Sequence, residues 1–240
     1  MSWGQNRACL GRALFAVLLV ATAVPAAASV LVVRASGPSA ASYPPGRSLP
    51  DNARITLRAN DTLVVLGGSG TRTFRGPGTF SPSAAVVAGQ RTLASNDGRR
   101  ARIGAVRNAG IVPRSPTIWH VDVTQSGTIC LASNRNVMLW RPDATAPLNL
   151  TITAPGGASR TVAWPAGQPT LAWPAGTRIA NGAAYGFRQP GVAVPTQIIF
   201  RILASDPPDL QAVAAALIAN GCQDQLDLLV ETQPEASPAG

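Results

Sequence analysis

Short runs of β-type residues, each closed by a turn signal, constrain the fold of this chain more than any other feature. Between residues 116 and 204 the pattern predicts seven strands, and they are Trp119–Val123, Ile129–Ala132, Val137–Trp140, Leu148–Ile152, Arg160–Trp164, Tyr185–Phe187 and Gln197–Leu203. Turn residues such as Gly156-Gly157 separate them. Short strands at this spacing are typical of an immunoglobulin-like β-sandwich. The cysteine spacing of true immunoglobulin domains is missing, so the expected likeness is one of architecture only.

After residue 204 the patterning changes from β to helical. Asp206 is a suitable N-cap, and Pro207 suits the first position of a helix. Apolar side chains from Leu210 to Ile218 form one stripe, as expected for an amphipathic helix. A second, shorter helix is expected from about Cys222 to Thr232. We therefore predict an α-hairpin over residues 205–232 that packs on or beside the sandwich.

The first 28 residues have the organisation of a bacterial secretory signal peptide. Arg7 and Arg12 give a positive start, and the apolar run from Leu14 to Val24 is far shorter than the roughly 20 residues of a membrane-spanning helix. Ala26–Ala28 then supplies a small-residue cleavage pattern. We expect cleavage near Ala28, no transmembrane segment in the mature chain, and a periplasmic or secreted location.

Export makes a disulfide the expected state of the two cysteines outside this leader. Cys9 lies in the segment to be removed, which leaves Cys130 and Cys222 in an oxidising compartment. Two cysteines allow a single pairing. The alternative is a pair of buried free thiols. The predicted bond would join a strand of the sandwich to the hinge between the two helices.

An earlier block, residues 29–82, carries a second set of β signals. Val30–Val33 is a β-branched run, Ile55–Leu57 alternates, and Leu63–Leu66 predicts a more buried strand. The glycines of Gly67-Gly68-Ser69-Gly70 predict a hairpin tip, because glycine takes positive φ at little cost. A small β unit therefore precedes the sandwich.

Several of these segments together resemble the FecR-like domain family of bacterial envelope proteins. They are Val30–Val33, Tyr43–Gly46 with Leu49-Pro50, Ile55–Leu57, Asp61–Leu66 and Arg75–Phe80. The resemblance covers about residues 30–82 and implies a β fold closed by a Gly-Pro-Gly-like corner. The family's anti-sigma members carry a cytoplasmic domain and a membrane helix before this unit. Too few residues precede the apolar run here to bind a sigma factor, so the resemblance implies the fold and not the signalling role.

A basic connector is expected over residues 83–115. It contains Arg99, Arg100 and Arg102 beside the turn Asn96–Gly98. Charge runs usually mark solvated segments, and the alternative is contact with an anionic surface through these three arginines. The whole chain has 20 basic and 11 acidic residues. The absence of lysine and the abundance of alanine and arginine are typical of a high-GC genome, which explains that balance better than nucleic-acid binding does. A basic surface on an exported protein could still attract anionic envelope polymers or lipid headgroups.

The chain contains few of the residues that catalytic and metal-binding motifs require. The single histidine, His120, stands two residues from Asp122. Alternate residues of one strand share a face and leave no room for a fixed His–Asp pair. Zinc needs three or four His, Cys or carboxylate ligands, and a Walker motif needs a lysine that the chain lacks. We expect no catalytic residue, no metal site and no cofactor.

Two tryptophans in a repeated pentapeptide are the best candidates for ligand binding. Ala163-Trp-Pro-Ala-Gly167 recurs as Ala172-Trp-Pro-Ala-Gly176, and exposed rings at Trp164 and Trp173 would stack on sugars. The alternative is a pair of core tryptophans at strand ends. A protein partner could instead add a strand to an open sheet edge or occupy the C-terminal helices.

The sequence thus predicts an exported, mainly β, non-enzymatic protein that binds a protein partner or a surface glycan in the bacterial envelope. The alternatives are a secreted hydrolase with an unrecognised site, a carbohydrate-binding module that uses Trp164 and Trp173, and a purely structural accessory domain. The expected order is a signal peptide (1–28), a FecR-like β domain (29–82), a basic connector (83–115), a β-sandwich (116–204), a helix pair (205–232) and a disordered tail (233–240).

Overall fold

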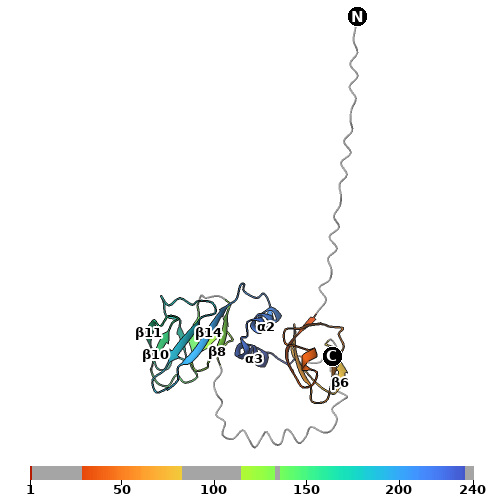
Figure 1. Ribbon diagram of the computed structural model, residues 1–240, viewed down its shortest axis with the longest axis horizontal. Helices are drawn as coiled ribbons and strands as arrows, with labels where there is room; N and C mark the ends of the chain where they lie inside the picture. Colours follow the sequence, from red (N-terminus) through yellow and green to blue (C-terminus); the bar gives the residue numbers. More distant parts are fainter. Residues whose placement is uncertain (2–28, 83–114, 133–135, 236–240) are drawn as a thin grey trace, which may run out of the picture.

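The computed structural model describes residues 1, 29–82, 115–132 and 136–235. Residues 2–28 of the predicted signal peptide and residues 83–114 of the predicted connector lie outside the described residues. The described fold is mainly β with two C-terminal helices, as predicted. Figure 1 shows two β units with the helices α2 (Leu210–Ala219) and α3 (Gln223–Thr232) between them.

The N-terminal β unit consists of two sheets and one turn of 3-10 helix. One sheet has the order β2-β1-β4-β5, and β3 pairs with β6 in the other. The elements are β1 (Ser29–Ser36), η1 (Ala40–Ser42), β2 (Ser48–Pro50), β3 (Ile55–Leu57), β4 (Thr62–Gly67), β5 (Gly70–Arg75) and β6 (Gly78–Phe80). The predicted hairpin tip is confirmed, because Gly67 pairs with Gly70 and only Gly68 and Ser69 lie between them.

The larger sheet of this unit is buried on both faces. Val30 and Val32 of β1 pack in the core of the unit itself, against residues such as Ile55. Leu31 and Val33 point the other way, into the core that contains the two helices. A strand covered on both faces needs a continuous apolar run, and this is why the whole of Val30–Val33 is apolar.

A buried carboxylate holds the turns of this unit together. Asp61 accepts hydrogen bonds from the backbone N–H of Ser39, at 2.9 Å, and from that of Arg58, while its own carbonyl accepts from the N–H of Gly76. Its neighbour Asn60 has a φ of 67°, in the left-handed region that asparagine tolerates. Burial raises the pKa of the Asp61 carboxyl, but the hydrogen bonds from Ser39 and Arg58 outweigh it and bring that pKa below its ordinary value.

The second β unit is a sandwich of two sheets, with the orders β11-β10-β13-β14-β8 and β12-β9-β7. Both sheets contribute to one apolar core. The strands are β7 (His120–Asp122), β8 (Gly127–Leu131), β9 (Met138–Trp140), β10 (Leu148–Thr153), β11 (Ser159–Trp164), β12 (Thr170–Ala172), β13 (Ala184–Arg188) and β14 (Thr196–Ile202). The prediction of seven strands missed β12, because its three residues lie between Pro169 and Pro174 and prolines mark breaks between strands.

The first helix begins later than predicted. Its N-cap is Asp209, whose side chain accepts a hydrogen bond from the N–H of Ala212 at 2.8 Å, and not Asp206. A proline disfavours the helical conformation in the residue before it, so Pro208 prevents a helical start at Pro207. The second helix begins directly after Cys222, at the predicted hinge.

The end of the described chain is paired with the N-terminal unit, where the sequence predicted disorder. The N–H of Thr71 donates to the carbonyl of Pro234 at 3.1 Å, and Glu235 forms a parallel bridge with Thr71. The prediction of disorder is therefore wrong for residues 233–235, because an edge strand can recruit a polar segment through its backbone alone. Residues 236–240 lie outside the described residues.

Candidate functional site

The helix pair is the joint between the two β units. It shares one core with Leu31 and Val33 of the N-terminal unit and with Cys130 and Leu203 of the sandwich. In Figure 1 the two helices lie between the units, with one unit on either side. The Ala-rich sequence of α2 is apolar on several sides of the helix. Such a helix is stable when other elements pack against each of those sides. The α-hairpin thus contacts the sandwich, as predicted, and the N-terminal unit as well.

The predicted disulfide joins the sandwich to the hinge of the helix pair. Cys130 on β8 and Cys222 before α3 have a sulfur–sulfur distance of 1.98 Å, and their Cα atoms are 5.9 Å apart. Both residues are fully buried. The cysteines are 92 residues apart in sequence. In the chain-entropy model a loop of that length makes the bond worth about 4–5 kcal/mol.

A buried glutamine reinforces the same contact one turn further along α3. The side chain of Gln225 accepts from the N–H of Cys130 and donates to the carbonyls of Cys130 and Ile118. Gln225 was not among the residues predicted to be functional. Gln225 falls on the same helical stripe as Cys222, Leu226 and Leu229, and a polar residue on an apolar stripe was the available signal.

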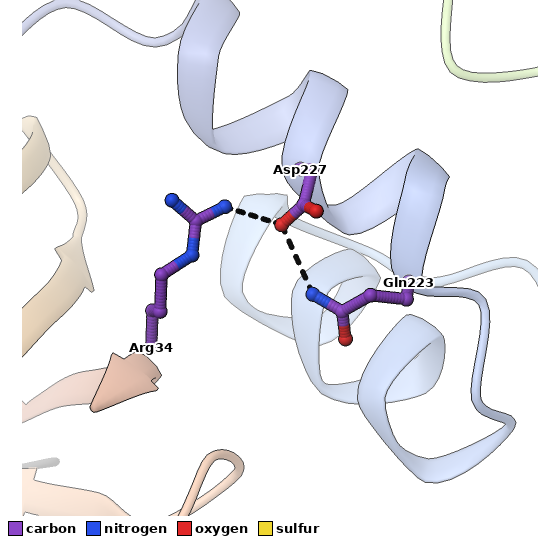
Figure 2. A network of polar contacts seen from close by, with 3 residues as sticks. All are labelled: Arg34, Gln223 and Asp227. Carbon is purple, nitrogen blue, oxygen red and sulfur yellow. Dashed lines mark hydrogen bonds and ion pairs between the residues drawn. The ribbon is translucent and has the colours of Figure 1, made fainter. Parts of the chain in front are cut away.

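Polar contacts also fasten the helices to the N-terminal unit. The side-chain amide of Gln211 donates to the carbonyls of Ser29 and Leu66, at 2.7 and 3.1 Å. Figure 2 shows the second contact, in which Arg34 of β1 forms an ion pair with Asp227 of α3, and Gln223 donates to the same carboxylate. The Arg34–Asp227 pair is solvent-exposed, so it orients the helix more than it stabilises it.

The two predicted sugar-stacking tryptophans are packing residues. Trp164 is 1% exposed, so the prediction of an exposed ring is wrong for it. Trp173 packs edge-on against three core rings, those of Tyr185, Phe187 and Phe200. In both copies of the pentapeptide the indole N–H donates to the carbonyl four residues on, in Gln168 and Thr177. The repeat therefore encodes a turn that is anchored in the core by its tryptophan.

A buried arginine completes the first of these turns. Arg141 is 4% exposed, and its guanidinium lies 4.9 Å from the centre of the Trp164 ring. It donates to the carbonyls of Ala146, Pro165 and Gln168. Arginine is expected at the surface, so nothing in the sequence marked this one as a core residue.

The described surface is hollowed at one end of the sandwich. The groove has a volume of about 370 Å³ and is lined by Ile152, Ala154, Pro155, Ala158, Ser159, Arg160, Gly176, Thr177, Arg178, Ala180 and Tyr185. Arg160 and Arg178 are its two charged residues, and no carboxylate lines it. One guanidinium nitrogen of Arg160 donates to the carbonyl of Ala175, and the Tyr185 hydroxyl donates to the carbonyl of Arg178. The groove is therefore a cationic site, which sequence analysis did not identify.

His120 and Asp122 are each engaged by a neighbouring threonine. The Nδ1 atom of His120 lies 2.8 Å from the Thr117 hydroxyl, and Asp122 accepts from the N–H and hydroxyl of Thr124. Burial lowers the pKa of the His120 imidazole. Burial also raises the pKa of the Asp122 carboxyl, the charge of Asp224 adds to that rise, and the Thr124 hydrogen bonds oppose it. Among the described residues, the hydrogen bonds of both side chains go to threonines.

Three further observations concern the remaining predictions. Arg99, Arg100 and Arg102 lie outside the described residues. Within the described ranges, no three His, Cys, Asp or Glu side chains gather as they would around a metal ion. The helices of the described chain are all too short or too polar to cross a membrane.

No family model, curated protein or solved structure matches this chain. The FecR-like resemblance of residues 30–82 accordingly stays a prediction.

Proposed function

We propose that this chain is an exported bacterial envelope protein that acts as a non-enzymatic binding module for a protein partner. Its FecR-like unit and its β-sandwich would be held together by the helix pair. The observation that carries the proposal is the Cys130–Cys222 bond at the centre of the joint, buried between the sandwich and the helices. A buried structural disulfide suits an oxidising compartment, and it fixes the surfaces that a partner would meet.

Three features of the described residues favour a protein partner over a glycan or a substrate. Of the tryptophans that would stack on sugars, Trp164 is buried in the core and Trp173 is half-buried and packs against it. The titratable pair His120 and Asp122 is bonded to threonines. A cationic groove adjoins β11, which is an edge strand of the larger sandwich sheet. Partner proteins commonly dock on such edges through their backbone.

Export is tested by the mass of the protein recovered from cells. The full chain with a tag after Gly240 is produced in a bacterial host and released by osmotic shock. We expect a species that begins at Ser29 and gains the mass of two hydrogens on reduction. An Ala28→Arg variant, which spoils the small-residue cleavage pattern, should keep the full leader. Recovery of the unprocessed chain in the cytosol with both thiols free would refute export.

Binding is tested by placing a photo-crosslinking amino acid at Thr161 on the edge strand β11. A matched control carries it at Arg54, an exposed position of the N-terminal unit. The proposal predicts a discrete protein adduct, identified by mass spectrometry, from Thr161 and not from Arg54. Equal labelling at both positions contradicts a specific partner. Retention on a glycan array by the purified protein would instead favour the glycan alternative.

A further inference from the structure

We propose that strand β11 and the adjoining groove bind an extended acidic segment of the partner, which adds to the sheet as a strand and places a carboxylate between Arg160 and Arg178. This inference rests on the proposed function and names the class of partner. Three observations carry it. The edge of β11 is free, the groove is positively charged, and Arg160 belongs both to β11 and to the lining of the groove.

The free edge of β11 follows from the pairing of β10 with β11. β11 is the outermost strand of its sheet, and Ala154 donates to the carbonyl of Ala158 across the hairpin turn. Hydrogen-bonded and non-hydrogen-bonded pairs alternate along an antiparallel ladder. Ser159, Thr161 and Ala163 therefore direct their N–H and C=O groups away from β10. All three residues are exposed.

The Thr151 and Thr161 hydroxyls support this assignment of the ladder. The two residues are opposite each other, and their hydroxyl oxygens are 2.8 Å apart. Side chains approach most closely in a non-hydrogen-bonded pair. Thr161, whose side chain meets that of Thr151 on the outer face, thus has backbone groups that point into solvent, where an incoming strand would pair with them.

The charge of the groove determines what kind of strand fits. Arg160 and Arg178 line it, and none of its lining residues is acidic. Within the described residues the ion pair is Arg34–Asp227, which lies at the joint. Neither groove arginine therefore has a carboxylate partner among the described residues. Arg160 uses one N–H group on Ala175, and a guanidinium has five. An acidic side chain is the complementary ligand.

Arg160 connects the edge to the groove. Residues opposite each other on neighbouring antiparallel strands point to the same face, with Cβ atoms about 5 Å apart. A glutamate that an added strand places opposite Arg160 would therefore point into the groove. Backbone pairing would supply affinity, and the Glu–Arg contact would select acidic sequences over neutral ones.

The test uses the purified mature protein, labelled with nitrogen-15, and the peptide acetyl-Thr-Val-Glu-Val-Thr-amide. The control peptides replace Glu with Gln or carry N-methyl valines, which block strand pairing. The protein variants are Arg160→Gln and Arg178→Gln. Arg188→Gln is the matched control, because Arg188 is also an exposed arginine, but it lies on β13 and does not line the groove. Thermal melts establish that each variant is folded.

We expect the Glu peptide to shift the amide resonances of Ser159, Thr161 and Ala163 and to slow their hydrogen exchange. Arg160→Gln and Arg178→Gln should each weaken the peptide about tenfold, as for the loss of one charge-assisted hydrogen bond. Arg188→Gln should leave the affinity almost unchanged. The Gln peptide should bind more weakly, and the N-methyl peptide should not bind.

Four results would overturn the inference. They are an absence of shifts at millimolar peptide, equal affinity for the Glu and Gln peptides, an Arg188→Gln effect as large as that of Arg160→Gln, and dimerisation of Arg160→Gln. The last would mean that Arg160 guards the edge against a second copy of this chain. The mass measurements that test export are independent of all four, so the proposed function can survive if the inference fails.

Discussion

Gln225 and Cys130 are joined by two hydrogen bonds that imitate the pairing of strands. The side-chain oxygen of Gln225 accepts from the N–H of Cys130 at 2.6 Å, and its nitrogen donates to the carbonyl of Cys130 at 2.9 Å. Cys130 lies on β8, the edge of the five-stranded sheet opposite to β11. The side-chain amide of Gln225 therefore takes the place of a neighbouring strand at Cys130, the residue of this edge that forms the disulfide.

Replacing Gln225 with leucine should destabilise the protein by about 3 kcal/mol, because buried backbone groups of Cys130 and Ile118 would lose their partner. Urea unfolding of the disulfide-bonded protein measures the change. Gln223→Leu is the matched control on the exposed side of the same helix and should change the free energy of unfolding by less than about 0.5 kcal/mol. Equal effects of the two substitutions would contradict the role given to Gln225.

Removing the disulfide with the pair Cys130→Ala and Cys222→Ala should lower the free energy of unfolding by about 4 kcal/mol, the amount expected for so long a loop. Because both cysteines are fully buried, a maleimide added to the reduced native protein should label them only as fast as the protein opens. Rapid labelling without unfolding would show that the joint is not packed as described.

Arg141→Lys should destabilise the sandwich by about 2–3 kcal/mol, since an ammonium group cannot reach three carbonyls and the indole face together. Intrinsic tryptophan fluorescence should also change, because Arg141 contacts the ring of Trp164. Arg188→Lys, at an exposed position, is the control. If the two arginine variants melt at the same temperature, the buried guanidinium is not structural.

Asp61→Asn should reduce the loss of stability in acid. The pKa of Asp61 lies below its ordinary value in the folded protein, so the charged carboxylate stabilises the fold. That contribution is present above the unfolded value, about 3.9, and is lost as the pH falls through the lower folded value. Unfolding free energies at pH 7 and pH 3 should differ more for the native protein than for Asp61→Asn. Asp206→Asn, in the exposed loop before α2, should behave like the native protein.

The strands and the disulfide were predictable because their signals are local or few. Alternation over Ile55–Leu57 and the glycines around Gly68 depend on neighbouring residues, and two cysteines allow only one pairing. The contact of the helix pair with the N-terminal unit was not predictable. An apolar stripe predicts that a helix packs against another element, but it does not identify that element. Small side chains such as those of Ala215 and Ala216 can pack against either β unit.

The candidate site was less predictable than the fold. Trp164 and Trp173 occur in an evident repeat, yet a repeat of a turn and a repeat of a binding motif have the same appearance in sequence. Arg160 and Arg178 are 18 positions apart on a strand and a loop, and only the tertiary fold brings them to one groove. Sequence patterns predict how neighbouring residues are arranged along one helix or strand, whereas the lining of a groove depends on distances between different elements.

The central position of the helix pair has a consequence for biogenesis. Both β units are synthesised before the segment that covers Leu31, Val33 and Leu203, so these apolar side chains stay uncovered until the helix pair has been synthesised. A product that stops before α2 would therefore expose these apolar side chains to chaperones and proteases, so synthesis of the helix pair separates a product that can fold from one that is degraded.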